Sequence, residues 1–85
     1  MWVIRLRDGT AHLIYLRDCI LDGSILYFDH EETALRFMQE VESHLANCLG
    51  IRATVTRWEG DRRKDSFCKV TPANMADFAE MILRF

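Results

Sequence analysis

Three cysteines and three histidines are the residues of this sequence best suited to nucleophilic or metal chemistry. The cysteines, Cys19, Cys48 and Cys68, form an odd and widely spaced set, which is typical of reduced thiols and not of a disulfide framework. Cys19 and Cys48 fall at apolar positions, and Cys68 has no neighbouring histidine to act as its base. His44 and Cys48 are four residues apart in a helical pattern, but zinc requires three or four ligands. The sequence therefore predicts neither a catalytic thiol nor a metal site.

The carboxylates also lack a catalytic arrangement. Glu31–Glu32 and Glu40–Glu42 are adjacent or two apart in a helical pattern, and such neighbours diverge around the helix axis. Glycines that are grouped can cradle a phosphate, but here they are spread one to a turn, at Gly9, Gly23, Gly50 and Gly60. We therefore expect a protein that is not an enzyme and that binds no cofactor.

One cluster of basic and aromatic side chains stands out from the rest of the chain. It occupies a predicted hairpin at 57–69 and comprises Arg57, Trp58, Arg62, Arg63, Lys64 and Lys69. Cations beside an aromatic stacking surface are what nucleic-acid-binding proteins use. Acidic residues are interleaved with these cations, so residues 51–69 carry six basic and three acidic groups. Nucleic-acid binding through this hairpin is the alternative function that the sequence suggests.

The N-terminal part of the chain, residues 2–28, is predicted to form β-strands. Two β-prone runs, 2–7 and 10–16, flank Asp8–Gly9, a dipeptide typical of two-residue hairpin turns. Such a turn would place Trp2 opposite Tyr15 and would sort the apolar side chains of both runs onto one face. A second Asp-Gly pair precedes a third strand at 24–28, so the sequence predicts a three-stranded meander.

A helix is predicted at roughly 30–49. Asp29 followed by Glu32 is typical of a capping box, in which both side chains bond to the first backbone amides. Apolar residues recur at steps of three and four from Ala34 to Leu49. Gly50 then occupies the position at which a left-handed residue commonly ends a helix.

The remaining elements are two strands and a second helix. Residues 51–56 alternate between apolar and polar types, and residues 66–70 are β-compatible. Thr71–Pro72 predicts the N-cap and first position of a helix that runs to the C-terminus. The predicted order is therefore βββ-α-ββ-α. We expect an α+β two-layer sandwich, with both helices on one face of an antiparallel-rich sheet of about five strands.

The composition is that of one small globular domain over residues 1–85. The chain is 49% hydrophobic and 28% charged, and its formal net charge of −2 gives no long-range attraction for nucleic acid or anionic lipid. No apolar run approaches the roughly 20 residues of a membrane span, and the N-terminal residues lack the pattern of a signal peptide. We therefore expect a cytoplasmic protein that does not bind membranes.

Residues 27–37, YFDHEETALRF, resemble the strand-to-helix entry of many short proteins from phages and other mobile elements. In that entry, aromatic residues are followed by Asp or Ser, then by acidic residues, and then by Ala and Phe. Some of these proteins are small inhibitors of host defence or adaptors, and this is the class of function that the resemblance implies. The pattern reports a helix start and indicates no particular family.

Protein binding is the function that remains after this elimination. The sheet face turned away from the helices would expose Val3 together with the predicted contact residues, which are Arg5, Arg7, His12, Tyr27 and Trp58. Arg, Tyr and Trp are the types that dominate interface hot spots. Strand edges also favour pairing with another chain or a symmetric homodimer. The sequence thus predicts a non-enzymatic module that binds a protein partner or a second copy of itself.

Overall fold

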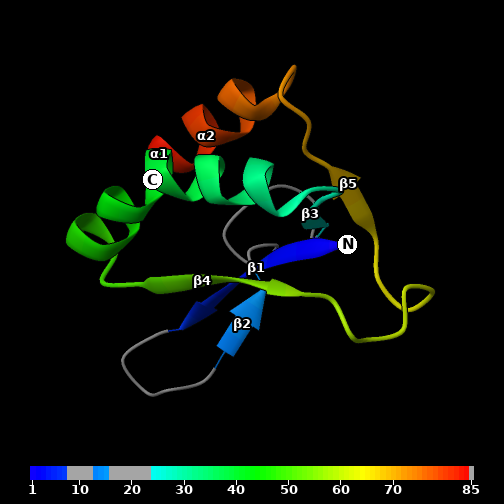
Figure 1. Cartoon of the computed structure of the whole chain (residues 1–85). Helices are drawn as coiled ribbons and strands as arrows, with labels where there is room; N and C mark the ends of the chain where they lie inside the picture. The colour runs from blue at the N-terminus through cyan, green and yellow to red at the C-terminus, as the bar shows by residue number, and fades with distance from the viewer. Residues whose placement is uncertain (8–12, 16–23, 85) are drawn as a thin grey trace.

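The computed structural model describes residues 1–7, 13–15 and 24–84. Within these residues, five strands and two helices follow one another in the predicted order. They are β1 (Trp2–Arg7), β2 (Leu13–Tyr15), β3 (Ile25–Phe28), α1 (Glu31–Cys48), β4 (Arg52–Arg57), β5 (Phe67–Lys69) and α2 (Met75–Leu83). The predicted α+β class is confirmed, and Figure 1 shows both helices on the same side of the sheet.

β1 is the central strand of a mixed sheet. One edge of β1 pairs with β4 in antiparallel orientation along the full length of both strands. The other edge pairs antiparallel with β3 near Trp2 and with β2 near Arg7. β3 in turn pairs in parallel with β5. The predicted meander is therefore wrong, because β3 returns to β1 instead of lying beside β2.

The predicted register of the first two strands is also wrong. Tyr15 lies opposite Arg5 instead of Trp2, and Leu13 lies opposite Arg7. The pairing is thus shifted by three residues along β1 from the predicted register. The Asp8–Gly9 turn and the second Asp-Gly pair both lie outside the described residues.

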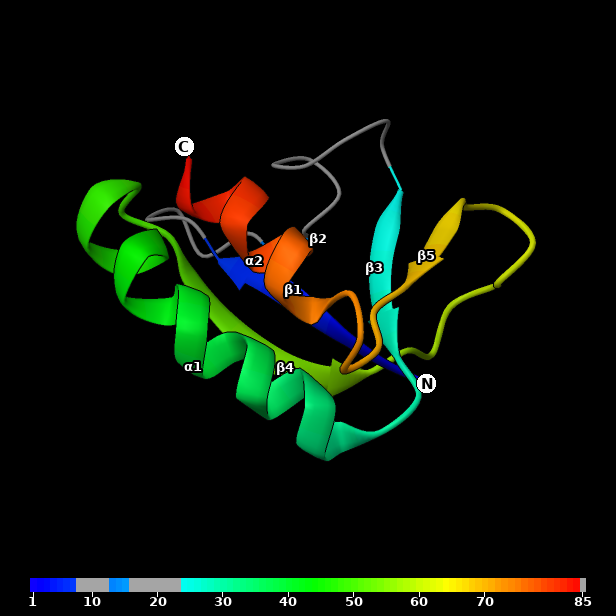
Figure 2. The same ribbon diagram turned by 90° about the horizontal axis from the view of Figure 1, so that it is seen from above.

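Residues 57–69 do not form the predicted hairpin. β4 pairs with β1 and β5 pairs with β3, so the chain between them crosses one end of the sheet from one side of β1 to the other (Figure 2). The Trp58 amide donates a hydrogen bond to the Met1 carbonyl oxygen at 3.0 Å, which ties this segment to the start of β1. Sequence reasoning paired β4 with β5 because they are neighbours along the chain, whereas each strand has a more extensive partner elsewhere.

The hydrophobic core fills the space between the sheet and the helices. Its largest fully buried side chains are Phe28 from β3 and Phe37 from α1, whose ring centroids are 5.4 Å apart. The sheet also contributes Ile4, Leu6 and Leu26, and the helices contribute Ala34, Met38, Val41, Leu45, Met75, Ala79 and Ile82. The apolar stripes predicted for both helices therefore face the core, although Leu49 and Phe78 are only partly buried and Cys48 is exposed. Phe85, the last residue of the predicted second stripe, lies outside the described residues. Cys48 is the last residue of α1, three residues beyond the last buried residue of that helix, Leu45.

The start of α1 differs from the predicted capping box. His30 is the N-cap residue, and its position has no side-chain capping hydrogen bond. Asp29 instead forms an ion pair with Lys69 of β5, so the ion pair replaces the cap. The end of α1 is as predicted: Gly50 adopts a φ of +66°, and the Ile51 amide donates to the Leu45 carbonyl oxygen at 2.8 Å.

α2 begins later than predicted. Thr71 and Pro72 belong to a turn, and the N-cap residue is Asn74. The Asn74 side chain bridges this turn: its Oδ1 accepts from the Thr71 amide at 2.8 Å, and its Nδ2 donates to the Lys69 carbonyl oxygen at 3.1 Å. The turn thereby sets the angle at which the chain leaves β5 and enters α2.

The outer face, which we define as the sheet face that the helices do not cover, is partly a second buried layer. Val3 pairs with Tyr27 on one side and with Thr56 on the other, and it alternates with core residue Ile4. Val3 and Ile25 both belong to this face and are fully buried. The prediction that Val3 is exposed is therefore wrong.

Candidate functional site

Three aromatic side chains meet on the outer face. The Trp58 and Phe67 rings pack edge-to-face with centroids 5.3 Å apart, and the Phe67 and Tyr27 rings do so at 6.0 Å. Each of the three is partly exposed. The structure thus brings together two predicted contact residues, Tyr27 and Trp58, through Phe67. Sequence reasoning missed Phe67, although its alternation with Cys68 in a predicted strand could have assigned it to this face.

The crossing segment packs closely against this cluster. A Cβ atom at Gly60 would lie 2.7 Å from Cζ2 of Trp58, so the backbone there approaches the indole as only glycine permits. Asp61 closes the next turn, since its Oδ1 accepts hydrogen bonds from the Arg63 amide at 2.9 Å and from Arg63 Nε at 3.3 Å. Trp58 is therefore held in place by local structure on its own segment as well as by Phe67.

The other predicted contact residues are divided between described and undescribed parts of the chain. Arg5 lies on the outer face, because it pairs with Thr54 and alternates with the buried residues Ile4 and Leu6, and it is partly buried. The backbone of Arg7 ends β1 opposite Arg52. His12 lies outside the described residues, as does the side chain of Arg7.

The basic cluster predicted at 57–69 is not a single surface. The Arg57 guanidinium lies over the Trp2 ring at 5.6 Å from its centroid, and Trp2 packs against the helix-side core. Lys69 Nζ lies 3.0 Å from Asp29 Oδ2. Their hydrogen bond holds the pKa of the Asp29 carboxyl below its ordinary value and raises the pKa of the Lys69 ammonium group. Each of these two cations is therefore engaged away from the loop tip.

The tip of the crossing segment retains the other three basic residues of the cluster. Arg62, Arg63 and Lys64 are all exposed. Arg63 is engaged by Asp61 in the turn described above. Of the six residues predicted to bind nucleic acid, only Arg62, Arg63 and Lys64 therefore remain together, at an exposed loop tip that follows Trp58 in the chain.

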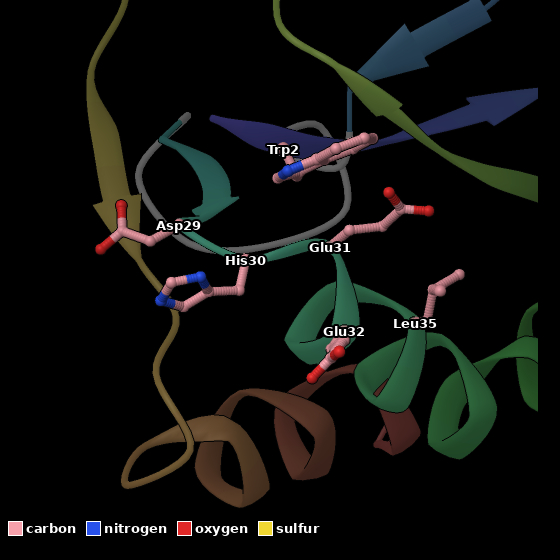
Figure 3. Close-up of a pocket in the computed structure, with 6 residues that line it drawn as sticks. All are labelled: Trp2, Asp29, His30, Glu31, Glu32 and Leu35. Atoms are coloured by element: carbon pink, nitrogen blue, oxygen red, sulfur yellow. The ribbon is translucent and has the colours of Figure 1, made fainter.

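An open depression of about 550 Å³ lies at the start of α1, lined by Trp2, Asp29, His30, Glu31, Glu32 and Leu35. Figure 3 shows that these side chains do not converge: Glu31 and Leu35 lie toward the Trp2 side, whereas Asp29 and His30 point away from Trp2. Groups that perform acid–base chemistry must reach a common atom. The depression is therefore a surface feature without a catalytic arrangement.

Other reactive side chains are also dispersed. Cys48 and Cys68 are free thiols, and Cys68 is partly buried. Within the described ranges, no three His, Cys, Asp or Glu side chains are grouped so that they could hold a metal ion. A smaller hollow of about 340 Å³ on α2 is lined by Asp77, Glu80, Met81 and Arg84, and Glu80 and Arg84 form an ion pair across one helical turn.

The outer face thus carries the three predicted contact residues whose side chains the structure describes, Arg5, Tyr27 and Trp58. In the part of the chain that the structure describes, no helix has the length and apolar character needed to cross a membrane. Compared with known proteins, the chain matches no family model, no curated protein and no solved structure.

Proposed function

We propose that this protein is a non-enzymatic protein-binding module, and that its contact surface is the part of the outer face formed by Arg5, Tyr27, Trp58 and Phe67. The observation that carries the proposal is the aromatic cluster of Tyr27, Phe67 and Trp58. Its rings are fixed by edge-to-face packing and remain partly exposed. Rigid aromatic side chains lose little conformational entropy on binding, and with arginine they dominate hot spots.

Two features favour another protein over a second copy of this chain as the partner. α1 packs over β4 and runs along it (Figure 2), so pairing of two β4 edges would bring the two α1 helices into steric conflict. Stacking of two outer faces would bring like charges together, because Arg5 and Arg52 lie on this face. The homodimer expected from the exposed edges is therefore the weaker of the two proposals. A small cytoplasmic inhibitor or adaptor of mobile-element type would act through such a surface.

The proposal is tested by capture of a partner from cells that contain the protein. Tyr27→Ala removes a partly exposed ring from the surface, whereas Leu35→Ala removes a side chain that is 45% exposed on α1. Both variants are first compared with the wild type by thermal melting. We expect a partner that is retained by the wild type and by Leu35→Ala and is reduced at least tenfold by Tyr27→Ala. Retention by Tyr27→Ala, or loss with Leu35→Ala alone, would show that the surface is misplaced.

The alternative proposal is nucleic-acid binding at the tip of the crossing segment. The exposed positions of Arg62, Arg63 and Lys64 beside Trp58 favour it, and the engagement of Arg57 and Lys69 elsewhere weakens it. The test is retention on single-stranded DNA and RNA by the wild type and by a variant with alanine at 62, 63 and 64. Binding that falls steeply with salt and disappears in the variant would support this alternative. Equal retention by both proteins would exclude it.

A further inference from the structure

β4 leaves one of its two long edges without a partner strand. It pairs with β1 along its whole length, from Arg52 opposite Arg7 to Arg57 opposite Trp2. Among the described residues, no strand pairs with its other edge, which we call the free edge. A strand edge presents backbone N–H and C=O groups that can pair with another chain. The chemistry that the free edge offers is therefore that of the backbone.

The hydrogen-bond register identifies the groups that the free edge presents. The Trp58 amide donates to the Met1 carbonyl oxygen, so these two residues form a hydrogen-bonded pair. In antiparallel strands such pairs alternate with non-hydrogen-bonded pairs, whose N–H and C=O groups point away from the partner strand. Ala53, Val55 and Arg57 lie an odd number of positions from Trp58, so they belong to the second kind. Their outward N–H and C=O groups make no hydrogen bond to any described residue.

The free edge lacks the usual protection of an edge strand. Such strands are commonly interrupted by a bulge, by proline or by a charged side chain. The pairing of residues 52–57 with β1 is continuous, so this strand contains no bulge, and its charged residues are confined to its two ends. Ile51, Ala53 and Val55 pack against the core and remain only partly buried. A further strand beside β4 would therefore gain backbone hydrogen bonds and cover apolar surface.

α1 decides which kind of partner fits the free edge. It packs over β4 and runs along it (Figure 2), so a second copy of this chain would bring its own α1 into steric conflict there. A single extended segment carries no such helix. We propose that the free edge of β4 binds an extended segment of another protein, which joins the sheet as an additional strand. This site is distinct from the outer face.

The two faces of β4 set the sequence pattern of that segment. Val55 faces the core on the helix side, whereas Thr54 and Thr56 lie on the opposite face of the strand. The side chains of an added strand would therefore alternate, with apolar ones on the helix side and polar ones on the other. The backbone bonds provide affinity, and this alternation provides selectivity.

The test uses the peptide KTVTVTK with blocked ends, titrated into the isotope-labelled protein and followed by NMR. In the free protein, we expect the amides of Ala53 and Val55 to exchange with solvent faster than those of Thr54 and Thr56, which bond to β1. Saturation with the peptide is expected to slow exchange of the two outward amides about tenfold or more. A counterpart peptide with its three central amides N-methylated keeps the side chains but loses the donors, and it is not expected to bind.

Each contrary result overturns the inference. Protection of every β4 amide in the free protein would show that the edge is already covered. Equal binding of the two peptides would show that backbone hydrogen bonds are not what is recognised. Shifts confined to β3 and β5 would place the peptide on the outer face, and an absence of binding at millimolar peptide would leave the edge without this activity.

A matched pair of variants tests the same bonds from the side of the protein. Ala53→Pro removes an outward N–H without removing a bond to β1, and Ala53→Ser retains that N–H. Once both are shown to fold by thermal melting, we expect Ala53→Pro to weaken peptide binding about fivefold or more and Ala53→Ser to change it less than about twofold. Equal effects would contradict the inference. The N-methylated peptide gives the same comparison with the unmodified protein, and partner capture with Tyr27→Ala tests the outer face separately.

Discussion

Trp58 is held between two very different neighbours, the ring of Phe67 and the backbone at Gly60. The ring packs edge-to-face on Phe67, and the glycine allows a backbone approach that a methyl group would block. At the scale of single residues, this arrangement explains why an aromatic side chain in a polar segment is partly buried. Glycine is required at position 60 because the backbone packs closely against the indole. At position 50 it is favoured because the backbone there has a positive φ.

Replacement of Gly60 by alanine is expected to lower the free energy of unfolding by about 1–3 kcal/mol, because its Cβ would lie 2.7 Å from the indole and would displace the ring. Urea titration measures this loss. The indole N–H signals of the two tryptophans report whether Trp58 has moved. Gly50→Ala is the control: it costs about 1 kcal/mol through its φ of +66° and leaves both indole signals in place. An unmoved indole signal in Gly60→Ala would contradict the proposed packing.

The Asp29–Lys69 ion pair predicts a defined pH dependence. Their hydrogen bond lowers the pKa of Asp29 from its ordinary 3.8, so its contribution is complete above that value and is lost as pH falls through the folded pKa. It raises the pKa of Lys69 from 10.5, so that contribution is lost as pH rises through the folded pKa. Asp29→Asn is therefore expected to lower the melting temperature at neutral pH and to have no effect at strongly acidic pH.

A double-mutant cycle provides the control for the ion pair. Asp29→Asn is repeated in a Lys69→Met background, in which the carboxylate has lost its partner. We expect the effect of Asp29→Asn at neutral pH to be smaller in this background. An unchanged effect would mean that Asp29 stabilises the fold through another contact. The pair is exposed, so salt is expected to reduce its contribution.

At the scale of elements, the connection from β5 to α2 depends on one amide side chain. Asn74 accepts from the Thr71 amide and donates to the Lys69 carbonyl oxygen, so it joins the end of the strand to the start of the helix. The sequence indicated a helix start in this region, but it suggested Thr71 as the cap because Thr-Pro is typical of an N-terminus. A turn intervenes instead, and Asn74 occupies the N-cap position three residues later, with its side chain bonded back to the turn and the strand and not to the helix amides.

Asn74→Ala is expected to lower the free energy of unfolding by about 1 kcal/mol, since both bridging hydrogen bonds are lost. Urea titration measures the change. Asn47→Ala serves as the comparison, because Asn47 is exposed on α1, and it is expected to change stability by less than about 0.5 kcal/mol. Equal effects of the two substitutions would show that the bridge contributes nothing beyond a surface contact.

At the scale of the whole molecule, the two helices carry six carboxylates and one arginine, whereas the described strands carry five cations and no acidic residue. This charge separation between the layers predicts how stability responds to salt. Oppositely charged layers attract, so raising NaCl from about 20 to 500 mM is expected to lower the melting temperature by a few degrees at pH 7. At strongly acidic pH, near 3, the 11 Lys and Arg residues give the protein a positive net charge. Salt then screens repulsion and is expected to raise the melting temperature. The same sign of effect at both pH values would contradict the electrostatic account.

The sequence by itself determined the class of the fold, the order of the elements and the buried stripe of each helix. These features depend on local periodicity: the steps from Ala34 to Leu45 and from Met75 to Ile82 place apolar side chains on one side of a helix in any context. The alternation of Ala53 and Val55 with threonines indicated β4 for the same reason, because a period of two is also a local pattern.

Only the tertiary structure decided which strands pair, and the candidate surface depends on that choice. The partner of a strand depends on every other strand edge in the folded protein. β4 therefore pairs with β1, and β5 pairs with β3, although β4 and β5 follow one another in the chain. That result placed Phe67 between Tyr27 and Trp58, turned Arg57 toward Trp2, and separated the strand cations from the helix carboxylates. Such relations join residues far apart in sequence, and local patterns carry no information about them.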